Sequence, residues 1–454
     1  MIGASLSRWT LSYFATGLVA LLGAEALMTA GVGFPSRALN DPETLVLVHL
    51  VALGWLSLLM CGALIQFVPV LVARPLVHPD LPAVALGALI AGVASLILGF
   101  VGMAGVGFGP SPWLQLGGIG LACGFALNIW NLGRTMWTAR PLSLPTRFVA
   151  AGLASLAGVV SLGVIFSFVL GGWTANGALV RLTSRAVPIH AAAGLGGWLT
   201  FTAIGVSYRL LAMFMLAPEA ERRTSLVAFF AGGGSILVLL VGGPVCILVL
   251  QRDPTHPLVA ALVLATLSLA CYGYDVAGLY RARKRKKLEL NARMAAWALA
   301  CLAIGILLTL VATASGEISR SIGALAFLFA FGWLSGLGLA KLYKIIAFVT
   351  WLECYGPVLG KRPTPRVQDL VDEARALPWL RLYFASVAIA LAAAFFSSPF
   401  IYRAAAGAML IATGKICIEF VRIRTLRFVS APMLPKDAGA RPRLLLPRLQ
   451  ASQP

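Results

Sequence analysis

Charged residues are scarce in this chain: Asp, Glu, Lys and Arg make up only 11% of the 454 residues, whereas apolar residues make up 59%. Because a water-soluble domain carries about 25% charged residues, this composition excludes a chain that covers its whole surface with polar groups. The mean hydropathy of +0.90 agrees with a protein that is solvated by lipid. We therefore expect the lipid bilayer to be its main partner.

Histidines and paired cysteines are scarce as well. The chain has four histidines and seven cysteines, and no two cysteines form a Cys-x-x-Cys pair. This spacing argues against a thiolate metal site and against a disulfide framework. The net charge of +20 does not indicate a nucleic-acid partner, because Lys and Arg gather in particular loops between apolar runs, as membrane topology requires.

Twelve apolar runs are long enough to cross roughly 30 Å of hydrocarbon, which takes about 20 helical residues. They predict an all-α polytopic membrane protein with one transmembrane domain over 1–430 and a cytoplasmic tail over 431–454. We expect this tail, rich in Pro and Arg, to be poorly ordered. The predicted helices are 10–33, 44–72, 82–106, 112–136, 147–171, 186–216, 224–251, 256–281, 292–314, 320–352, 378–397 and 400–425.

The distribution of basic residues predicts the orientation of these helices. The N-terminus, the even-numbered loops and the C-terminal tail hold 30 of the 36 Lys and Arg residues, and the odd-numbered loops hold 6. Basic residues are retained on the cytoplasmic side of membrane proteins. Both termini are therefore expected in the cytoplasm.

A repeat occurs at 47–71, 190–214 and 325–349. Each copy contains Gly-Trp-Leu-Ser or Gly-Trp-Leu-Thr, and the copies are 143 and then 135 residues apart. This distance is about the length of four spans with their loops, and such repeats often reveal the architecture of a membrane protein. The sequence thus predicts three pseudo-symmetric arcs of four helices each.

Two histidines precede this signature inside the apolar region. His49 lies five residues before Gly54, and His190 lies seven residues before Gly197. A difference of two positions, at about 100° per residue, turns them to nearly opposite faces of equivalent helices. In a three-fold ring such faces can point into one gap, where two imidazoles can ligate one haem iron. The alternatives are core histidines bonded to a carbonyl or hydroxyl, another metal, or a proton-transfer role.

The segment His49-Leu-Val-Ala-Leu-Gly-Trp55 resembles the haem-bearing helix of haem–copper oxidase subunit I. Within that superfamily it is most similar to the branch of cbb3-type oxidases and nitric oxide reductases. The resemblance implies twelve helices in three arcs, a place in the bacterial cytoplasmic (inner) membrane and a b-type haem. It also implies a partner membrane subunit or an electron donor.

The resemblance carries over only in part. His49 stands where the family has a low-spin haem ligand, and His190 stands where it has a copper ligand. Leu325 and Phe327 occupy the places of the helix-10 histidine pair, and the predicted helix 224–251 has no histidine. We therefore expect no copper site and no terminal oxidase activity, so no catalytic residue is assigned. Electron transfer or handling of a diatomic gas (NO or O2) is the expected role, and the sequence leaves open whether the chain is an enzyme.

Three acidic residues lie within predicted helices. Glu25 has no evident partner in the sequence and is the leading candidate for a proton or cation role, with Asp275 as the second. Asp275 is expected to pair with a basic residue near the same membrane end, such as Arg281. For Glu419, the spacing predicts an i,i+4 pair with Lys415 on one helix face.

Two alternatives to the haem hypothesis stay open. The first is a haem-free membrane transporter or permease on the same scaffold, with Glu25 or Asp275 coupled to protons. The second is a relative of the NnrS-type haem and copper membrane proteins, which share the helix count, although their paired-histidine motif is not seen here. The other two histidines, His78 and His256, lie in loops and are expected to be solvated.

Overall fold

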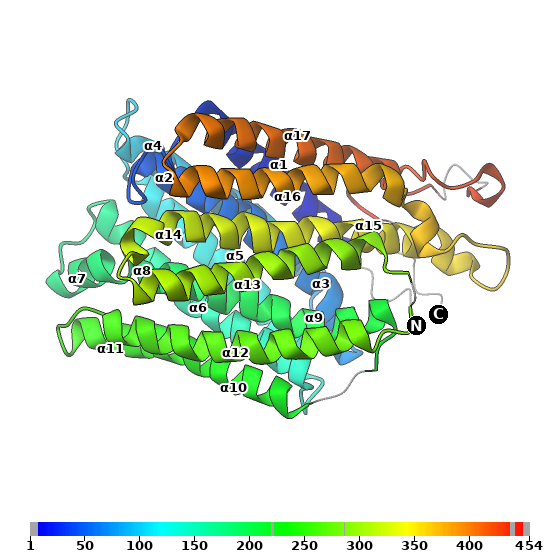
Figure 1. Ribbon diagram of the computed structural model, residues 1–454, viewed down its shortest axis with the longest axis horizontal. Helices are drawn as coiled ribbons and strands as arrows, with labels where there is room; N and C mark the ends of the chain where they lie inside the picture. The colour runs from blue at the N-terminus through cyan, green and yellow to red at the C-terminus, as the bar shows by residue number, and fades with distance from the viewer. Residues whose placement is uncertain (1–7, 219–221, 286, 436–440, 448–454) are drawn as a thin grey trace. The chain divides into compact units, whose positions relative to one another are not determined.

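The structure, a computed structural model, describes residues 8–218, 222–285, 287–435 and 441–447. Within these residues it contains helices and no strand, and twelve of the helices are long and apolar enough to cross a membrane (Figure 1). In a bilayer every backbone polar group must be satisfied within the protein, which a helix achieves by itself. The chain is an all-α polytopic membrane protein, as the sequence predicted.

Each predicted span is present, and the differences are confined to the helix ends. The break expected at Ser397-Ser398-Pro399 separates the last two helices. In chain order the spans are α1 (Thr10–Ala30), α2–η2–α3 (Pro42–His49, Leu50–Ser57, Leu58–Val72), α4 (Leu81–Met103), α5 (Trp113–Trp137), α6 (Leu144–Leu170), α8–η3–α9 (Val187–Ala192, Ala193–Thr200, Phe201–Met215), α10–η4–α11 (Arg223–Leu237, Val238–Gly242, Gly243–Leu248), α12 (Thr255–Arg281), α13 (Leu290–Ala314), α14–η5–α15 (Ile318–Phe327, Leu328–Ser335, Gly336–Tyr355), α16 (Glu373–Phe395) and α17 (Pro399–Arg424).

The helices form two compact units. Unit 1 comprises Met1–Gln66 and Leu288–Pro454, and unit 2 comprises Phe67–Lys287. In unit 1, α16 lies alongside α17, which also packs against α1; the α16–α17 pair is drawn in orange in Figure 1. In unit 2, α4 packs along α5 and α10 packs along α12.

The three repeat copies share a local backbone that the sequence did not predict. Each Gly-Trp-Leu-Ser/Thr motif lies at the end of an eight-residue π-helix, namely η2, η3 and η5. The three π-helices begin at equivalent positions, Leu50, Ala193 and Leu328, and their tryptophans are 0 to 2% exposed. Since π-helical turns are rare and are frequent at functional sites, this register supports the repeat. The arrangement of the repeats in three arcs stays a prediction.

Hydroxyl groups bind the carbonyls of these π-helices. Ser57 Oγ donates to the Ala52 carbonyl at 2.8 Å, and the equivalent Ser335 Oγ donates to Ala330 at 2.7 Å. In η3 the Ala193 carbonyl accepts from Ser155 Oγ at 3.1 Å. Each bond reduces the cost of a backbone carbonyl inside the protein. The Ser or Thr of the motif therefore has a structural use in at least two copies.

Small residues set the contact between α4 and α5 in unit 2. A Cβ atom at Gly92 would lie 2.6 Å from the Leu121 backbone nitrogen, and one at Gly117 would lie 2.7 Å from the Leu96 nitrogen. Small residues at membrane-helix interfaces allow the two backbones to approach closely and gain van der Waals contact. These glycines are therefore part of the packing of unit 2.

The C-terminal tail packs on unit 1 where it is described. A short 3-10 helix, η8 (Ala431–Met433), is held by the Tyr355 hydroxyl, which donates to the Met433 carbonyl at 3.1 Å. Further along, the Arg443 amide donates to Glu353 Oε1 at 3.3 Å. The rest of the tail that was expected to be poorly ordered, 436–440 and 448–454, lies outside the described residues.

Candidate functional site

His49 is the last residue of α2 and directly precedes the π-helix η2 in unit 1. Its side chain is half-buried, and Nδ1 lies 2.8 Å from the Leu45 carbonyl one turn earlier. Because a carbonyl can only accept, this contact requires the proton on Nδ1 and leaves the lone pair on Nε2. A backbone carbonyl that holds the far ring nitrogen is the usual outer contact of a metal-binding histidine.

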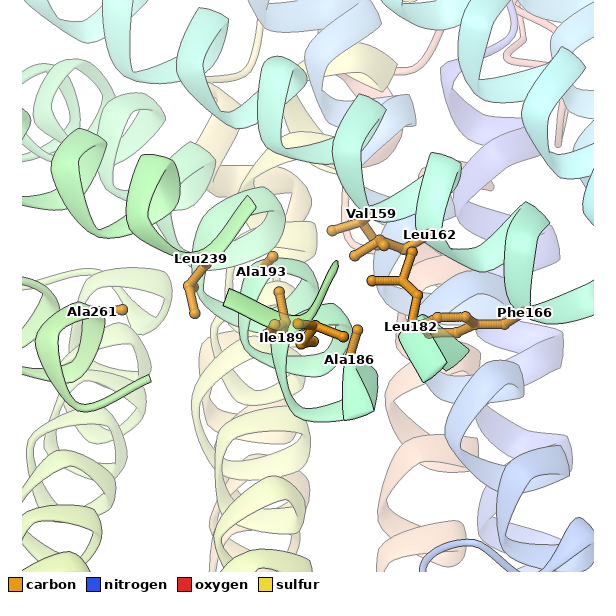
Figure 2. Packing of buried hydrophobic residues seen from close by; sticks show 10 residues of the cluster. Val159, Leu162, Phe166, Leu182, Ala186, Ile189, Ala193, Leu239 and Ala261 are labelled. Carbon is orange, nitrogen blue, oxygen red and sulfur yellow. The ribbon is translucent and has the colours of Figure 1, made fainter. Parts of the chain in front are cut away.

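His190 lies in α8, the short α-helix that opens the sixth span in unit 2. Its half-buried ring packs against Phe166, with ring centroids 5.4 Å apart and planes tilted by 56°. Gly163 faces it from α6, since a Cβ there would lie 3.4 Å from the imidazole Cε1. The neighbouring Ile189 is fully buried among apolar side chains of α6, α7 (Gly177–Arg185) and η4 (Figure 2). His190 thus lies beside an apolar cluster.

The two candidate ligands belong to different units, His49 to unit 1 and His190 to unit 2. The prediction that one haem takes both imidazoles therefore stays a prediction. On the common frame of the repeat, His49 and His190 are two positions apart. Both lie in α-helical turns, in α2 and α8, before the π-helix of each copy begins. The rotation of about 100° per residue used to compare them applies to such turns.

The short helix α7 was not predicted, and it carries the basic residues nearest in sequence to His190. Its N-cap is Asn176, whose side chain accepts from two backbone amides, and its Leu182 is buried in the apolar cluster. Arg181 and Arg185 project from this helix as exposed residues. Both arginines belong to unit 2, as His190 does.

The positions that match the family's helix-10 histidines are filled by apolar packing. Leu325 is 1% exposed and Phe327 is 5% exposed. The Phe327 ring stacks on Phe331 with centroids 4.9 Å apart, and it also contacts Tyr402 at 5.6 Å. Among the described residues no group of three or more His, Cys, Asp or Glu side chains is placed to hold a metal ion. The expectation of no copper site stays a prediction.

The remaining two histidines are exposed; His78 lies in a loop as expected, whereas His256, also expected in a loop, lies in the first turn of α12. The backbone amide of His78 donates to Asn131 Oδ1 at 3.1 Å, and its carbonyl accepts from Asn131 Nδ2 at 2.8 Å. The imidazoles of His78 and His256 take no part in these contacts, and both residues are exposed. These two histidines make good controls for any experiment on His49 and His190.

Asp275, the second candidate for a proton role, is a fully engaged structural acid. Its oxygens accept from the Tyr208 hydroxyl at 2.9 Å and the Thr224 hydroxyl at 2.5 Å. Its ion-pair partner is Arg222, 4.0 Å away on the turn before α10. The partner is therefore Arg222, which lies 53 positions before Asp275, and not the expected Arg281. Arg222 comes close to Asp275 because α10 packs along α12. Two hydroxyl donors and one guanidinium group around the Asp275 carboxylate favour a structural role for this residue.

Glu419 also has a different partner from the expected one. Its Oε1 pairs with Arg422 Nη1 at 2.5 Å, in an i,i+3 arrangement on α17. The ammonium group of Lys415 instead lies over the Trp379 ring, 5.5 Å from its centroid. Helical spacing alone allows either pairing, and the aromatic ring contributed by α16 decides between them.

Glu25 is buried in unit 1, and the described residues give its carboxyl group no basic partner. The residue is 0% exposed, and its Oε1 accepts from the Thr413 hydroxyl of α17 at 2.9 Å. Its Oε2 has no hydrogen-bond partner in the described part of the chain. Sequence reasoning identified Glu25 as the lone acid, but it missed Thr413, which is 388 residues away and has no distinguishing motif.

Two ion pairs in unit 1, one buried and one half-buried, were also missed by sequence reasoning. Arg424 pairs with Glu353 at 2.8 Å, and Lys344 pairs with Glu289 at 2.8 Å. Each pair joins separate helices or a helix and a loop, so neither leaves an i,i+3 or i,i+4 pattern in the sequence. The signal that was available is the presence of Glu353 and Lys344 within an apolar span.

The chain matches no family model and no curated protein sequence.

Proposed function

We propose that this chain is a membrane protein of the haem–copper oxidase subunit I type that lacks the copper site and binds one b-type haem. His49 Nε2 is the proposed axial ligand. The proposed role is electron transfer or the handling of a diatomic gas in a bacterial cytoplasmic membrane, with both termini in the cytoplasm. The observation that carries the proposal is the contact of His49 Nδ1 with the Leu45 carbonyl, which leaves the ligand lone pair on Nε2.

The donor set fits a haem better than it fits another metal centre. A b-type haem needs one or two imidazoles and an apolar surround, and His49 and His190 each occupy the start of a repeat helix. The apolar cluster beside His190 would suit the apolar ring of a haem. The basic residues Arg181 and Arg185 of α7 would suit its anionic propionates. The sequence-based prediction that His190 is the second axial ligand forms part of the proposal.

The residues of this chain have defined tasks toward that group. A bound haem supplies one-electron chemistry and, at an open axial position, the capacity to bind a diatomic gas. The Leu45 carbonyl would hold the His49 ring in one orientation through Nδ1. Phe327, Phe331 and Tyr402 occupy the space around the helix-10 positions with ring packing. This packing favours a haem protein without an adjacent copper ion.

An optical spectrum tests the proposal directly. The full-length protein is purified from haem-replete cells, its oxidised and dithionite-reduced spectra are recorded, and haem is quantified per chain as the pyridine haemochrome. We expect about one b-type haem per chain and a loss of most of it in His49→Ala. His78→Ala and His256→Ala, which change exposed histidines, should retain the full amount. A colourless wild-type protein, or a His49→Ala variant with unchanged haem, would refute the proposal.

The second ligand is tested by the same measurement. If His190 is the other axial ligand, His190→Ala loses haem or converts its spectrum from low spin to high spin. If His190→Ala keeps a low-spin spectrum and full haem content, the bis-histidine prediction is wrong and His49 has a different partner. Monodispersity in size-exclusion chromatography separates both results from misfolding.

A further inference from the structure

The Glu25 carboxyl group lies deep enough to be shielded from water. It is also close enough to the end of α1 to exchange protons with water there. The residue is five positions before the end of α1 at Ala30, which is roughly 8 Å along the helix axis. At that end Arg403 Nε donates to the Thr29 carbonyl, and this contact is exposed. The Glu25 carboxyl group therefore lies within the apolar span, close to the polar rim that Arg403 and the Thr29 carbonyl form at the end of α1.

The surroundings of Glu25 are polar but not cationic. Thr413 on α17 binds one oxygen, and the titratable side chains within electrostatic range are Tyr383 of α16 and Cys417 of α17. The Tyr383 hydroxyl donates to the Phe331 carbonyl of η5 at 3.1 Å. This set of hydroxyl groups can orient a proton or a water molecule, but it offers no positive charge to an ionised carboxylate.

Three other acidic side chains provide an internal comparison. Asp275, Glu353 and Glu419 are each only 4% exposed at the side chain, and each has an arginine within 4.0 Å. Glu25 is buried at least as deeply, yet Thr413 is the one hydrogen-bond partner that the described residues give its carboxyl group. A buried acid with an arginine is explained by the ion pair. Glu25 has no such explanation, and ionisable groups inside membrane spans mark proton relays and ion pathways.

We propose that Glu25 is a proton-exchanging group within unit 1. In the protonated state it is a neutral carboxylic acid in an apolar span. On release, the O–H bond breaks, the proton passes to a water molecule that enters from the rim near Arg403, and the electron pair stays on the carboxylate. The Thr413 hydroxyl then donates to that carboxylate. Uptake is the reverse of this step, so atoms and charge balance without any other reactant. The proposal does not depend on haem.

Dicyclohexylcarbodiimide is a suitable probe, because this hydrophobic reagent reacts with protonated carboxyl groups in apolar surroundings. The acid adds across the carbodiimide without a leaving group, so peptide mass spectrometry locates the adduct. In wild-type protein in liposomes we expect Glu25 to be labelled and Asp275, Glu353 and Glu419 to remain unlabelled. Labelling of Glu25 should slow as the bathing pH is raised, because a group that exchanges protons with the medium loses its reactive form.

Variants and a second measurement complete the test. Glu25→Gln should abolish this labelling and remove one carboxylic acid C=O band from the infrared spectrum. In wild-type protein that band should shift in D2O. Thr413→Val should keep the band but move its frequency, because one hydrogen bond is lost. His49→Ala should change neither readout, which separates this proposal from the haem proposal. No labelling of Glu25, labelling at a rate independent of pH, or a band that ignores D2O would overturn the proposal.

Discussion

The ion pair between Glu353 and Arg424 offers the sharpest test of how unit 1 is held together. It joins the end of α15 to the end of α17, the two side chains are each 4% exposed, and the N···O distance is 2.8 Å. Arg424 also donates to the Thr350 hydroxyl at 2.9 Å and to the Arg443 carbonyl of the tail. The perturbation is Arg424→Met, which keeps much of the side-chain length and removes the charge and all donors.

The expected cost follows from what the substitution leaves behind. Glu353 would keep the Arg443 amide, at 3.3 Å, but would lose the Arg424 guanidinium in a buried position. Removing one partner of a buried pair typically costs about 3–5 kcal/mol, whereas replacing both partners by apolar residues of similar volume is often neutral or stabilising. We therefore expect Arg424→Met to lose about 3–5 kcal/mol and Glu353→Leu/Arg424→Met to recover most of that loss.

Unfolding in mixed detergent micelles, titrated with SDS and followed by tryptophan fluorescence, gives the free energy of unfolding for each variant. The single substitutions Glu353→Leu and Arg424→Met complete a double-mutant cycle with the double variant. A sizeable coupling energy, with the double variant more stable than either single variant, is the expected result. If Arg424→Met costs less than about 1 kcal/mol, or if the two losses add, the pair is not a buried and coupled unit and the reasoning is refuted.

Two further predictions concern packing. Gly92→Ala should destabilise unit 2 by about 1–3 kcal/mol, because the new methyl group would lie 2.6 Å from the Leu121 backbone nitrogen. The control is Gly87→Ala on the same helix, whose new methyl group meets nothing within 4 Å and which should be neutral in the same SDS titration. Trp55→Phe removes the 2.8 Å bond from Nε1 to the Ser335 hydroxyl between two repeat copies, and it should cost about 1–2 kcal/mol when the lost bond and the lost ring volume are combined. A free energy of unfolding unchanged by Trp55→Phe would contradict a structural use of the repeat tryptophan.

The spans and the repeat could be predicted from the sequence because both are local properties. Apolar length alone identifies a membrane helix, as a helix satisfies its own backbone groups. The recurrence of Gly-Trp-Leu-Ser/Thr revealed three related segments, and the structure shows them with π-helices in one register. The π-helices themselves were missed, because an i→i+5 bond pattern leaves no signal in apolar periodicity. The same applies to α7, whose nine residues are too few for a span.

The candidate site likewise has residues that the sequence predicted and partners that it did not. Sequence identified His49, His190, Glu25 and Asp275 as costly groups inside apolar spans, since any polar side chain is conspicuous there. Their partners were predicted less well: Asp275 binds Arg222 and not the expected Arg281.

What the sequence by itself determined is that this chain is a helical membrane protein with an internal repeat and a few ionisable residues within its apolar spans. The tertiary structure decided which of those residues are balanced by a partner. It placed Arg222 beside Asp275, whereas the Thr413 hydroxyl is the one partner that the described part of the chain gives the Glu25 carboxyl group. The physical reason is that hydrophobic length belongs to each helix separately. A hydrogen bond or an ion pair, in contrast, forms only where helices distant in sequence pack against one another.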